Sequence, residues 1–223
     1  MKNIRRILKE DDLGDMGIGA MIVFIAMVLV AGIAASVLIQ TANRLEIQAM
    51  KTGQETTRQV STGIAIQDIE GNATGGAIVE LTLTVRARAG SGDLDLSQTV
   101  IELTDGTTKT LLAYDSTAGQ FDRINETATP QVFDSALWTA WALDNEHFGI
   151  LVLQDADNSM SQAYPVLNQG DLAMLCINTA SCFAPGINPR IDVTGLVSPE
   201  QGAPGIFAFR VPSSLTASVY ALY

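Results

Sequence analysis

Few residues in this chain could carry out catalysis. Its 223 residues include 1 histidine and 2 cysteines. No Gly-rich phosphate loop, nucleophile elbow or histidine–carboxylate zinc motif occurs in the sequence. The histidine, His147, precedes Phe148 at the start of an apolar segment, which favours a surface or structural role. The sequence therefore predicts neither an enzyme nor a bound cofactor.

Aromatic residues are also scarce, at 6% against 47% for all hydrophobic residues, so the apolar content comes from Ala, Val, Ile and Leu. Charged side chains are absent from Ile18 to Ile39. A run of about 20 apolar residues can cross the hydrocarbon core of a bilayer, roughly 30 Å thick. A helix that is apolar on every side must be surrounded by lipid or by other helices. Small residues such as Ala31, Gly32 and Ala34 favour packing between helices, and a simple membrane anchor with a polar stalk is the alternative.

Charge divides the chain into two unequal parts. Residues 1–14 carry 4 basic and 3 acidic side chains, a net charge of +1, whereas the rest carries 9 basic and 21 acidic, a net charge of −12. Basic residues just before an apolar span favour a cytoplasmic location for that end, so the acidic remainder is expected outside. An acidic surface repels nucleic acid, which argues against a nucleic-acid binder.

The order of the N-terminal segments differs from that of a conventional secretory signal, which ends in a small-residue cleavage site after its apolar stretch. Here a polar leader, Met1 to Gly14, comes before the apolar stretch. Removal of the leader alone would keep the helix in the mature protein. Beyond Ile39 the helical pattern narrows to a weak heptad seam, formed by Leu38, Ala42, Leu45, Ala49, Thr52 and Thr56. The predicted regions are a leader at 1–14, a helix at 15–68 and a β-rich outer domain at 69–223.

Residues 17–31, GIGAMIVFIAMVLVA, resemble the N-terminal signature of archaeal flagellins (archaellins), and the likeness continues through residues 34–39. The resemblance implies a type IV pilin-like leader that a dedicated prepilin/preflagellin-type membrane peptidase cuts after Gly14, so that Asp15 becomes the new N-terminus. Bacterial type IV pilins usually place a glutamate at the fifth mature position. That position here is Gly19, and no acidic residue lies between Asp15 and Glu46, which favours an archaellin.

The same resemblance implies a structural subunit of the archaellum, the archaeal flagellum. After transient membrane insertion, the chain would form a homopolymer, or a co-polymer with other archaellins, in an extracellular motility filament that a membrane-bound, ATP-driven machine assembles and rotates. An archaeal adhesion pilin is the alternative. A membrane-anchored enzyme or binding module would need a concentrated polar site, which the outer region lacks. The residues expected in the filament core are Ile18, Met21, Ile22, Phe24, Ile25, Val28, Leu29, Ile33, Val37 and Leu38.

The pattern of the outer region is typical of strands. Apolar residues alternate with polar ones from Val79 to Ala89, and Asp105-Gly106 separates two further apolar segments in the manner of a hairpin turn. Short strands at this spacing indicate an antiparallel sandwich or barrel, so the fold class is α+β, and the resemblance implies an immunoglobulin-like outer domain. Further strand candidates are residues 148–153, 172–177, 190–197, 206–211 and 217–222.

Two covalent modifications are expected in an extracellular domain. Cys176 and Cys182 are too few for a four-ligand zinc site, and a disulfide between them is favoured over free thiols. Asn72-Ala73-Thr74 and Asn125-Glu126-Thr127 fit the acceptor pattern for N-glycosylation. We expect a glycan on at least one of these asparagines.

Some loop residues could supply the oxygen ligands that calcium prefers, namely Asp155, Asp157 and Asn158, or the pair Asp93 and Asp95. Neither group has an EF-hand-like pattern. Ordinary solvated loop acids are the favoured interpretation, and no metal is predicted.

Overall fold

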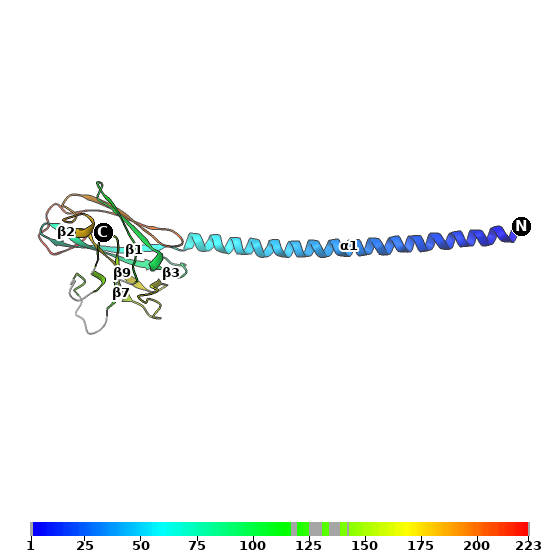
Figure 1. Ribbon diagram of the computed structural model, residues 1–223, viewed down its shortest axis with the longest axis horizontal. Helices are drawn as coiled ribbons and strands as arrows, with labels where there is room; N and C mark the ends of the chain where they lie inside the picture. Colours follow the sequence, from blue (N-terminus) through cyan, green and yellow to red (C-terminus); the bar gives the residue numbers. More distant parts are fainter. Residues whose placement is uncertain (1, 117–119, 125–130, 134–138, 142, 223) are drawn as a thin grey trace. The chain divides into compact units, whose positions relative to one another are not determined.

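One long helix precedes all the strands (Figure 1). The computed structural model describes residues 2–116, 120–124, 131–133, 139–141 and 143–222, with side chains from Gly17 onward. Helix α1 spans Lys2–Ser61. The chain divides into two compact units, Met1–Glu55 and Thr56–Tyr223, and the second contains every strand. We call this second unit the outer domain.

Helix α1 ends at Ser61, before the expected boundary at residue 68, and strand β1 begins at Ile64. The chain leaves the helix where its backbone pairs with a distant segment. The Ala203 backbone N–H donates to the Thr62 carbonyl at 2.8 Å, and the Ile64 N–H donates to the Ala203 carbonyl at 3.3 Å. A Cβ on Gly63 would lie 2.7 Å from the Ala203 oxygen, so the close approach requires glycine there. This partner is remote in sequence, which is why the helical pattern alone did not predict the end of the helix.

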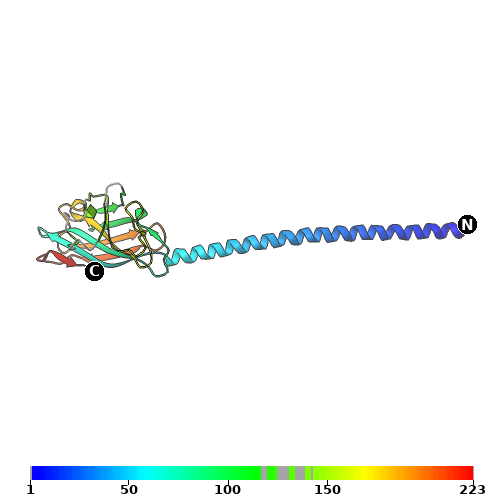
Figure 2. The same cartoon turned by 90° about the horizontal axis from the view of Figure 1, so that it is seen from below.

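Ten of the twelve strands in the described part of the chain form two main sheets. The larger sheet has the order β12-β1-β2-β9-β7-β6, and the smaller one has the order β11-β10-β4-β5. The strands of the outer domain are drawn as arrows in Figure 2. The strands of the larger sheet are β1 (Ile64–Thr74), β2 (Ala77–Ala87), β6 (Phe121–Arg123), β7 (Gly149–Gln154), β9 (Leu172–Asn178) and β12 (Val219–Ala221). Those of the smaller sheet are β4 (Val100–Thr104), β5 (Lys109–Leu112), β10 (Asp192–Ser198) and β11 (Gly205–Arg210).

Short elements complete the outer domain. Strands β3 (Leu94–Asp95) and β8 (Val166–Leu167) form a separate two-stranded pair. The remaining elements are the 3-10 helices η1 (Leu96–Gln98) and η2 (Thr139–Trp141) and the short helix α2 (Thr179–Cys182). The Asn178 side chain accepts a hydrogen bond from the Ser181 backbone and so caps α2.

The main core lies between the two large sheets. One cluster of buried side chains joins Leu81 and Leu83 of β2 with Val193 and Val197 of β10 and Phe207 of β11. Full burial of such a side chain contributes about 1.5–3 kcal/mol. The expected sandwich is therefore confirmed, and the sheets do not close into a barrel. The pairing is antiparallel in both main sheets except between β6 and β7, which are parallel.

Two hairpins show how local sequence sets the strand pairing. Gly75 and Gly76 have φ values of 66° and 87° and form the two-residue turn between β1 and β2. Two-residue hairpins favour a turn type that requires positive φ at both central residues, and glycine adopts positive φ without strain. The expected turn at Asp105-Gly106 joins β4 to β5, where the Asp105 carboxylate accepts hydrogen bonds from the Thr107 and Thr108 backbones.

Candidate assembly site

The apolar part of α1 is exposed around its whole circumference. All ten residues expected in the filament core lie on this helix, and their exposed fractions run from 52% at Ile25 to 70% at Leu38. Residues Gly17–Ser61 form a helix long and apolar enough to cross a membrane, judged by length and composition. Every residue from Gly17 to Val60 is exposed.

Leaving these ten side chains in water costs a large free energy. Each big apolar side chain left in water instead of being buried costs about 1.5–3 kcal/mol, so the ten together cost roughly 15–30 kcal/mol. That exceeds the net stability of a typical domain, about 5–15 kcal/mol. The segment therefore needs an apolar environment supplied by lipid or by helices of other chains.

The glycines of this helix indicate which of these environments suits it. A Cβ on Gly17, Gly19 or Gly32 would meet no atom within 4 Å, so nothing in the described part of the chain requires glycine there. Glycine inside a helix costs about 1 kcal/mol relative to alanine in water. Small residues allow the backbones of neighbouring helices to approach closely, so these positions suit helix–helix contact.

The second half of α1 is more polar but still carries exposed apolar side chains. Leu45, Ile47 and Met50 are 62%, 68% and 59% exposed. Leu45 belongs to the heptad seam expected from the sequence, whereas Ile47 and Met50 lie outside it. The apolar surface of this half is thus broader than a two-stranded seam needs.

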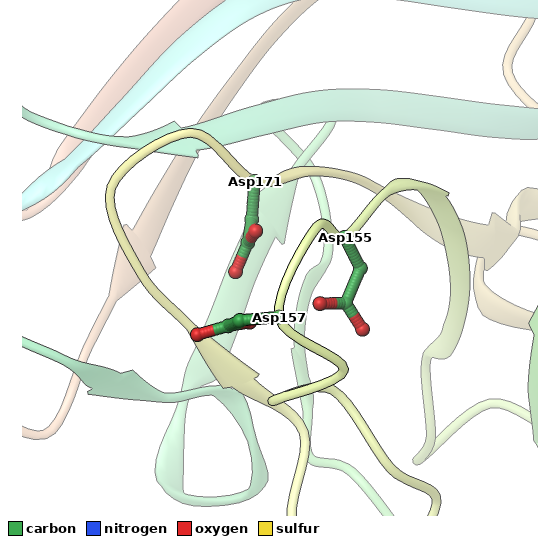
Figure 3. Close-up of side chains that lie close together, drawn as sticks. All are labelled: Asp155, Asp157 and Asp171. Atoms are coloured by element: carbon green, nitrogen blue, oxygen red, sulfur yellow. The ribbon is translucent and has the colours of Figure 1, made fainter.

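Figure 3 shows a cluster of acidic side chains found among the described residues of the outer domain. Carboxylate oxygens of Asp155, Asp157 and Asp171 all lie within 4.8 Å of one another. The cluster forms because the segment after β7 turns back beside the start of β9. Oxygen donors at this spacing could hold a hard cation such as Ca²⁺.

Protein donors already contact all three carboxylates. Arg123 Nη2 donates to Asp155 Oδ2 at 2.7 Å, and Asp155 is only 1% exposed. Asn168 Nδ2 donates to Asp157 at 2.6 Å, and the Asn168 backbone N–H donates to Asp171 at 3.0 Å. A backbone hydrogen bond from Ser159 is the largest cause of the lowered pKa of Asp157. These bonds hold the loop 155–171 together.

Comparisons with known proteins agree on one family. A family model described as archaeal-type flagellin matches residues 14–209. Flagellin B2 of Methanocaldococcus jannaschii is 44% identical over 201 residues, covering 90% of each chain. Flagellin B3 of the same organism is 41% identical over 211 residues, covering 94% of this chain and 95% of its relative.

The chain belongs to the archaeal-type flagellin family.

Solved structures agree with the assignment. The crystal structure of archaeal flagellin FlaB1 from Methanocaldococcus jannaschii superposes with a TM-score of 0.65 at 30% identity, covering 72% of this chain and 96% of that one. A chain from the archaeal flagellum of Methanospirillum hungatei shares the fold, with a TM-score of 0.59 at 15% identity. As an archaeal flagellin, the chain is a structural subunit of the archaellum filament, which lies outside the cell.

Flagellins of this family are structural proteins. The only histidine in the sequence, His147, is held by contacts with neighbouring residues of the outer domain. His147 Nδ1 lies 2.9 Å from Asp144 Oδ1, and the His147 backbone pairs with Ala113. Hydrogen bonds from the Glu146 backbone and from His147 lower the pKa of Asp144.

The two cysteines are not brought together. Both are free thiols in the structure. Cys176 packs in a small cluster with Trp141 and Leu151, whereas Cys182 packs against the main core. The side chains of neighbouring strand residues point to opposite faces, so Cys176 faces away from the sandwich core that Ile177 enters. The expected disulfide is therefore absent from the structure.

Of the two possible glycosylation sites, Asn72 lies within the described residues. Asn72 is half-buried near the end of β1, and its Nδ2 donates to Glu80 Oε2 on β2 at 2.8 Å. Asn125 lies outside the described residues. Nδ2 of an asparagine carries two hydrogens, so this bond leaves one position for a glycan.

Sequence reasoning grouped Asp155 and Asp157 with Asn158 but missed Asp171 and Arg123. The Asn158 side chain accepts a hydrogen bond from Arg123 Nη1 at 2.8 Å. Asp171 follows the turn residue Gly170, and Arg123 lies on β6, so only the fold brings them to the loop. A pattern of Asp-x-Asp alone could not identify them.

Proposed function

We propose that this flagellin is made as a precursor and that a prepilin/preflagellin-type peptidase cleaves it after Gly14, so that the mature chain begins at Asp15. Three observations support this proposal. The family model begins at residue 14. The basic residues of the leader all precede residue 14, and the uncharged helical segment begins at Met16.

Cleavage would free the helix to move from lipid into the filament. A charged side chain in the middle of an apolar layer costs about 2.5–3.5 kcal/mol or more, so the 4 basic residues of the leader would hold the uncleaved end at the cytoplasmic surface. Without them, helices of neighbouring subunits replace the lipid around Ile18 to Ile39. Close packing drives this exchange, because lipid already solvates apolar side chains well.

The outer domain forms the filament surface, and the chain polymerises with itself or with other archaellins. A membrane-bound machine assembles and rotates the filament. The observation that carries the proposal is the fully exposed apolar helix on a chain whose family forms filaments.

Loss of swimming after gene deletion, with surface attachment retained, is expected for a motility filament. Retained swimming with lost attachment would instead support an adhesion pilus.

Processing is tested by mass spectrometry of filaments sheared from cells. We expect the N-terminal peptide to begin at Asp15 and the intact mass to lack residues 1–14. The same spectra test whether Asn72 or Asn125 carries a glycan. A chain that keeps its leader and stays in the membrane would contradict the processing step.

Helix burial in the filament is tested by Ala34→Glu, with Ala34→Ser as a small, uncharged polar control. Ala34 lies in the middle of the exposed apolar helix. The glutamate should abolish filaments, while the serine should leave them intact. Normal filaments from Ala34→Glu would refute a close-packed helical core.

A further inference from the structure

The outer face of the four-stranded sheet carries large apolar side chains. Along β11 the inward residues are buried and the outward ones exposed, and Ile206 is 75% exposed. Leu111 of β5 and Val100 of β4 point outward in the same way, at 58% and 40%. We call this surface the β11–β5 face. It holds three of the five large apolar side chains that are exposed among the described residues 62–222.

Ile206 and Leu111 lie on one row of residues that crosses the sheet. The register pairs Ile206 with Leu196, Leu196 with Glu102, and Glu102 with Leu111. One row thus crosses all four strands, and three of its four side chains are aliphatic. Directly opposed side chains in such a ladder lie about 4.5–5.5 Å apart at their Cβ atoms. Ile206 and Leu196 are therefore direct neighbours, and Glu102 of β4 lies between Leu196 and Leu111.

The β11–β5 face is also electrically neutral, unlike the domain around it. Residues 62–223 carry 6 basic and 18 acidic side chains, a net charge of −12. The face has two ion pairs: Lys109 Nζ lies 2.6 Å from Glu102 Oε1, and Arg210 Nε lies 3.6 Å from Asp192 Oδ1. Both pairs link outward-pointing residues of the same sheet.

The outer side of the larger sheet differs in charge. Asp68 and Glu70 of β1 and Glu80 of β2 lie there, against a single basic residue of these two strands, Arg86 of β2, so the charges on this side do not balance. Partial burial, followed by the charge of Asp68, raises the pKa of Glu70. Two domains that met through this side would bring like charges together.

We propose that the β11–β5 face is the surface through which the outer domain contacts the outer domain of a second copy of this chain in the filament. The inference rests on polymerisation as described above. Two copies that each carry −12 repel one another, and repulsion is smallest where the approaching surface has no net charge. Contact there also removes Ile206 and Leu111 from water. A helical filament is built from contacts between unlike surfaces, so a different surface of the second copy covers this face.

The test is Ile206→Glu in the full chain, expressed in a host that makes archaella. Ile206 is mostly exposed, so the outer domain should still fold, which equal precursor levels and equal protease resistance in membranes would verify. We expect the share of subunits recovered in sheared filaments to fall about tenfold, because burial of one such side chain is worth about one factor of ten in an equilibrium constant.

Two further variants separate apolar contact from general charge. Tyr164→Glu adds the same charge at a side chain that is 70% exposed elsewhere on the domain, and it should leave filament yield within about twofold of wild type. Ile206→Lys reduces the net charge of the domain but also removes the apolar contact, so its yield should fall as for Ile206→Glu. An increased yield with Ile206→Lys would show that only overall charge matters, and would overturn the proposal.

Comparison of Ile206→Glu with Ala34→Glu distinguishes a wrong contact surface from a wrong filament function. If Ile206→Glu gives wild-type yield while Ala34→Glu abolishes filaments, the β11–β5 face is not a contact and the filament function stands. If neither variant affects filament yield, assembly through the apolar helix is itself refuted.

Discussion

Removal of the Arg123 side chain should destabilise the outer domain strongly. Arg123 donates at 2.7 Å to Asp155, at 2.8 Å to the Met160 carbonyl and at 2.8 Å to Asn158. Asp155 is 1% exposed, so Arg123→Ala leaves a buried carboxylate close to Asp157 and Asp171 without its cation.

The expected size of the effect follows from this burial. Loss of one partner of a buried pair costs about 3–5 kcal/mol. Arg123 itself is 37% exposed, so water can replace part of the interaction and we expect the lower end, about 3 kcal/mol. For a domain of this size, 1 kcal/mol lowers the Tm by about 2–4 °C, so the Tm should fall by roughly 6–12 °C.

The assay is thermal unfolding of the detergent-solubilised chain, followed by near-UV circular dichroism. Both of the 2 tryptophans and all 4 tyrosines lie beyond residue 61, so this signal reports on the outer domain. Lys109→Ala is the matched control, because its pair with Glu102 is largely exposed and should contribute about 0–1 kcal/mol. Equal Tm changes for Arg123→Ala and Lys109→Ala would refute the reasoning.

Two further predictions concern groups whose pKa is shifted by burial. Burial, then the charge of Asp144, raises the pKa of Cys182 to about 11, and burial likewise raises the pKa of the Cys176 thiol. Without reductant, iodoacetamide at pH 8 should therefore label both cysteines quickly in the unfolded chain and slowly in the folded one; no labelling after unfolding would instead indicate a disulfide. Burial also raises the pKa of Glu80 above its ordinary value of 4.5. The folded state thus binds this proton more tightly than the unfolded state and loses stability as the pH rises past that value. Glu80→Gln should raise the Tm at pH 7 and have less effect near pH 4, and a larger effect at pH 4 would reverse the assigned sign.

The sequence alone determined the assembly element. The run from Ile18 to Ile39 has no charged residue, and its apolar side chains surround the helix wherever the rest of the chain lies. A continuous apolar run of this length predicts an apolar helix without any knowledge of tertiary contacts. The same holds for the hairpin at Asp105-Gly106, whose turn residues set the pairing of the adjoining strands.

Strand β1 shows where local patterns were insufficient. Its ladder with β2 is irregular between Ile66 and Asp68 and between Asn72 and Ala73. Such irregularities interrupt the alternation of inward and outward residues, so the sequence pattern did not reveal the strand. Its start is fixed instead by backbone pairing with Ala203.

Only the tertiary structure decided which side chains meet in the outer domain. Arg123 reaches Asp155 because β6 pairs with β7, and the two cysteines are kept apart because one faces the core and the other does not. The row from Ile206 to Leu111 exists because the order β11-β10-β4-β5 places them in register. Sequence periodicity determines which face of a strand is apolar, but the order of strands depends on contacts between residues far apart in the chain.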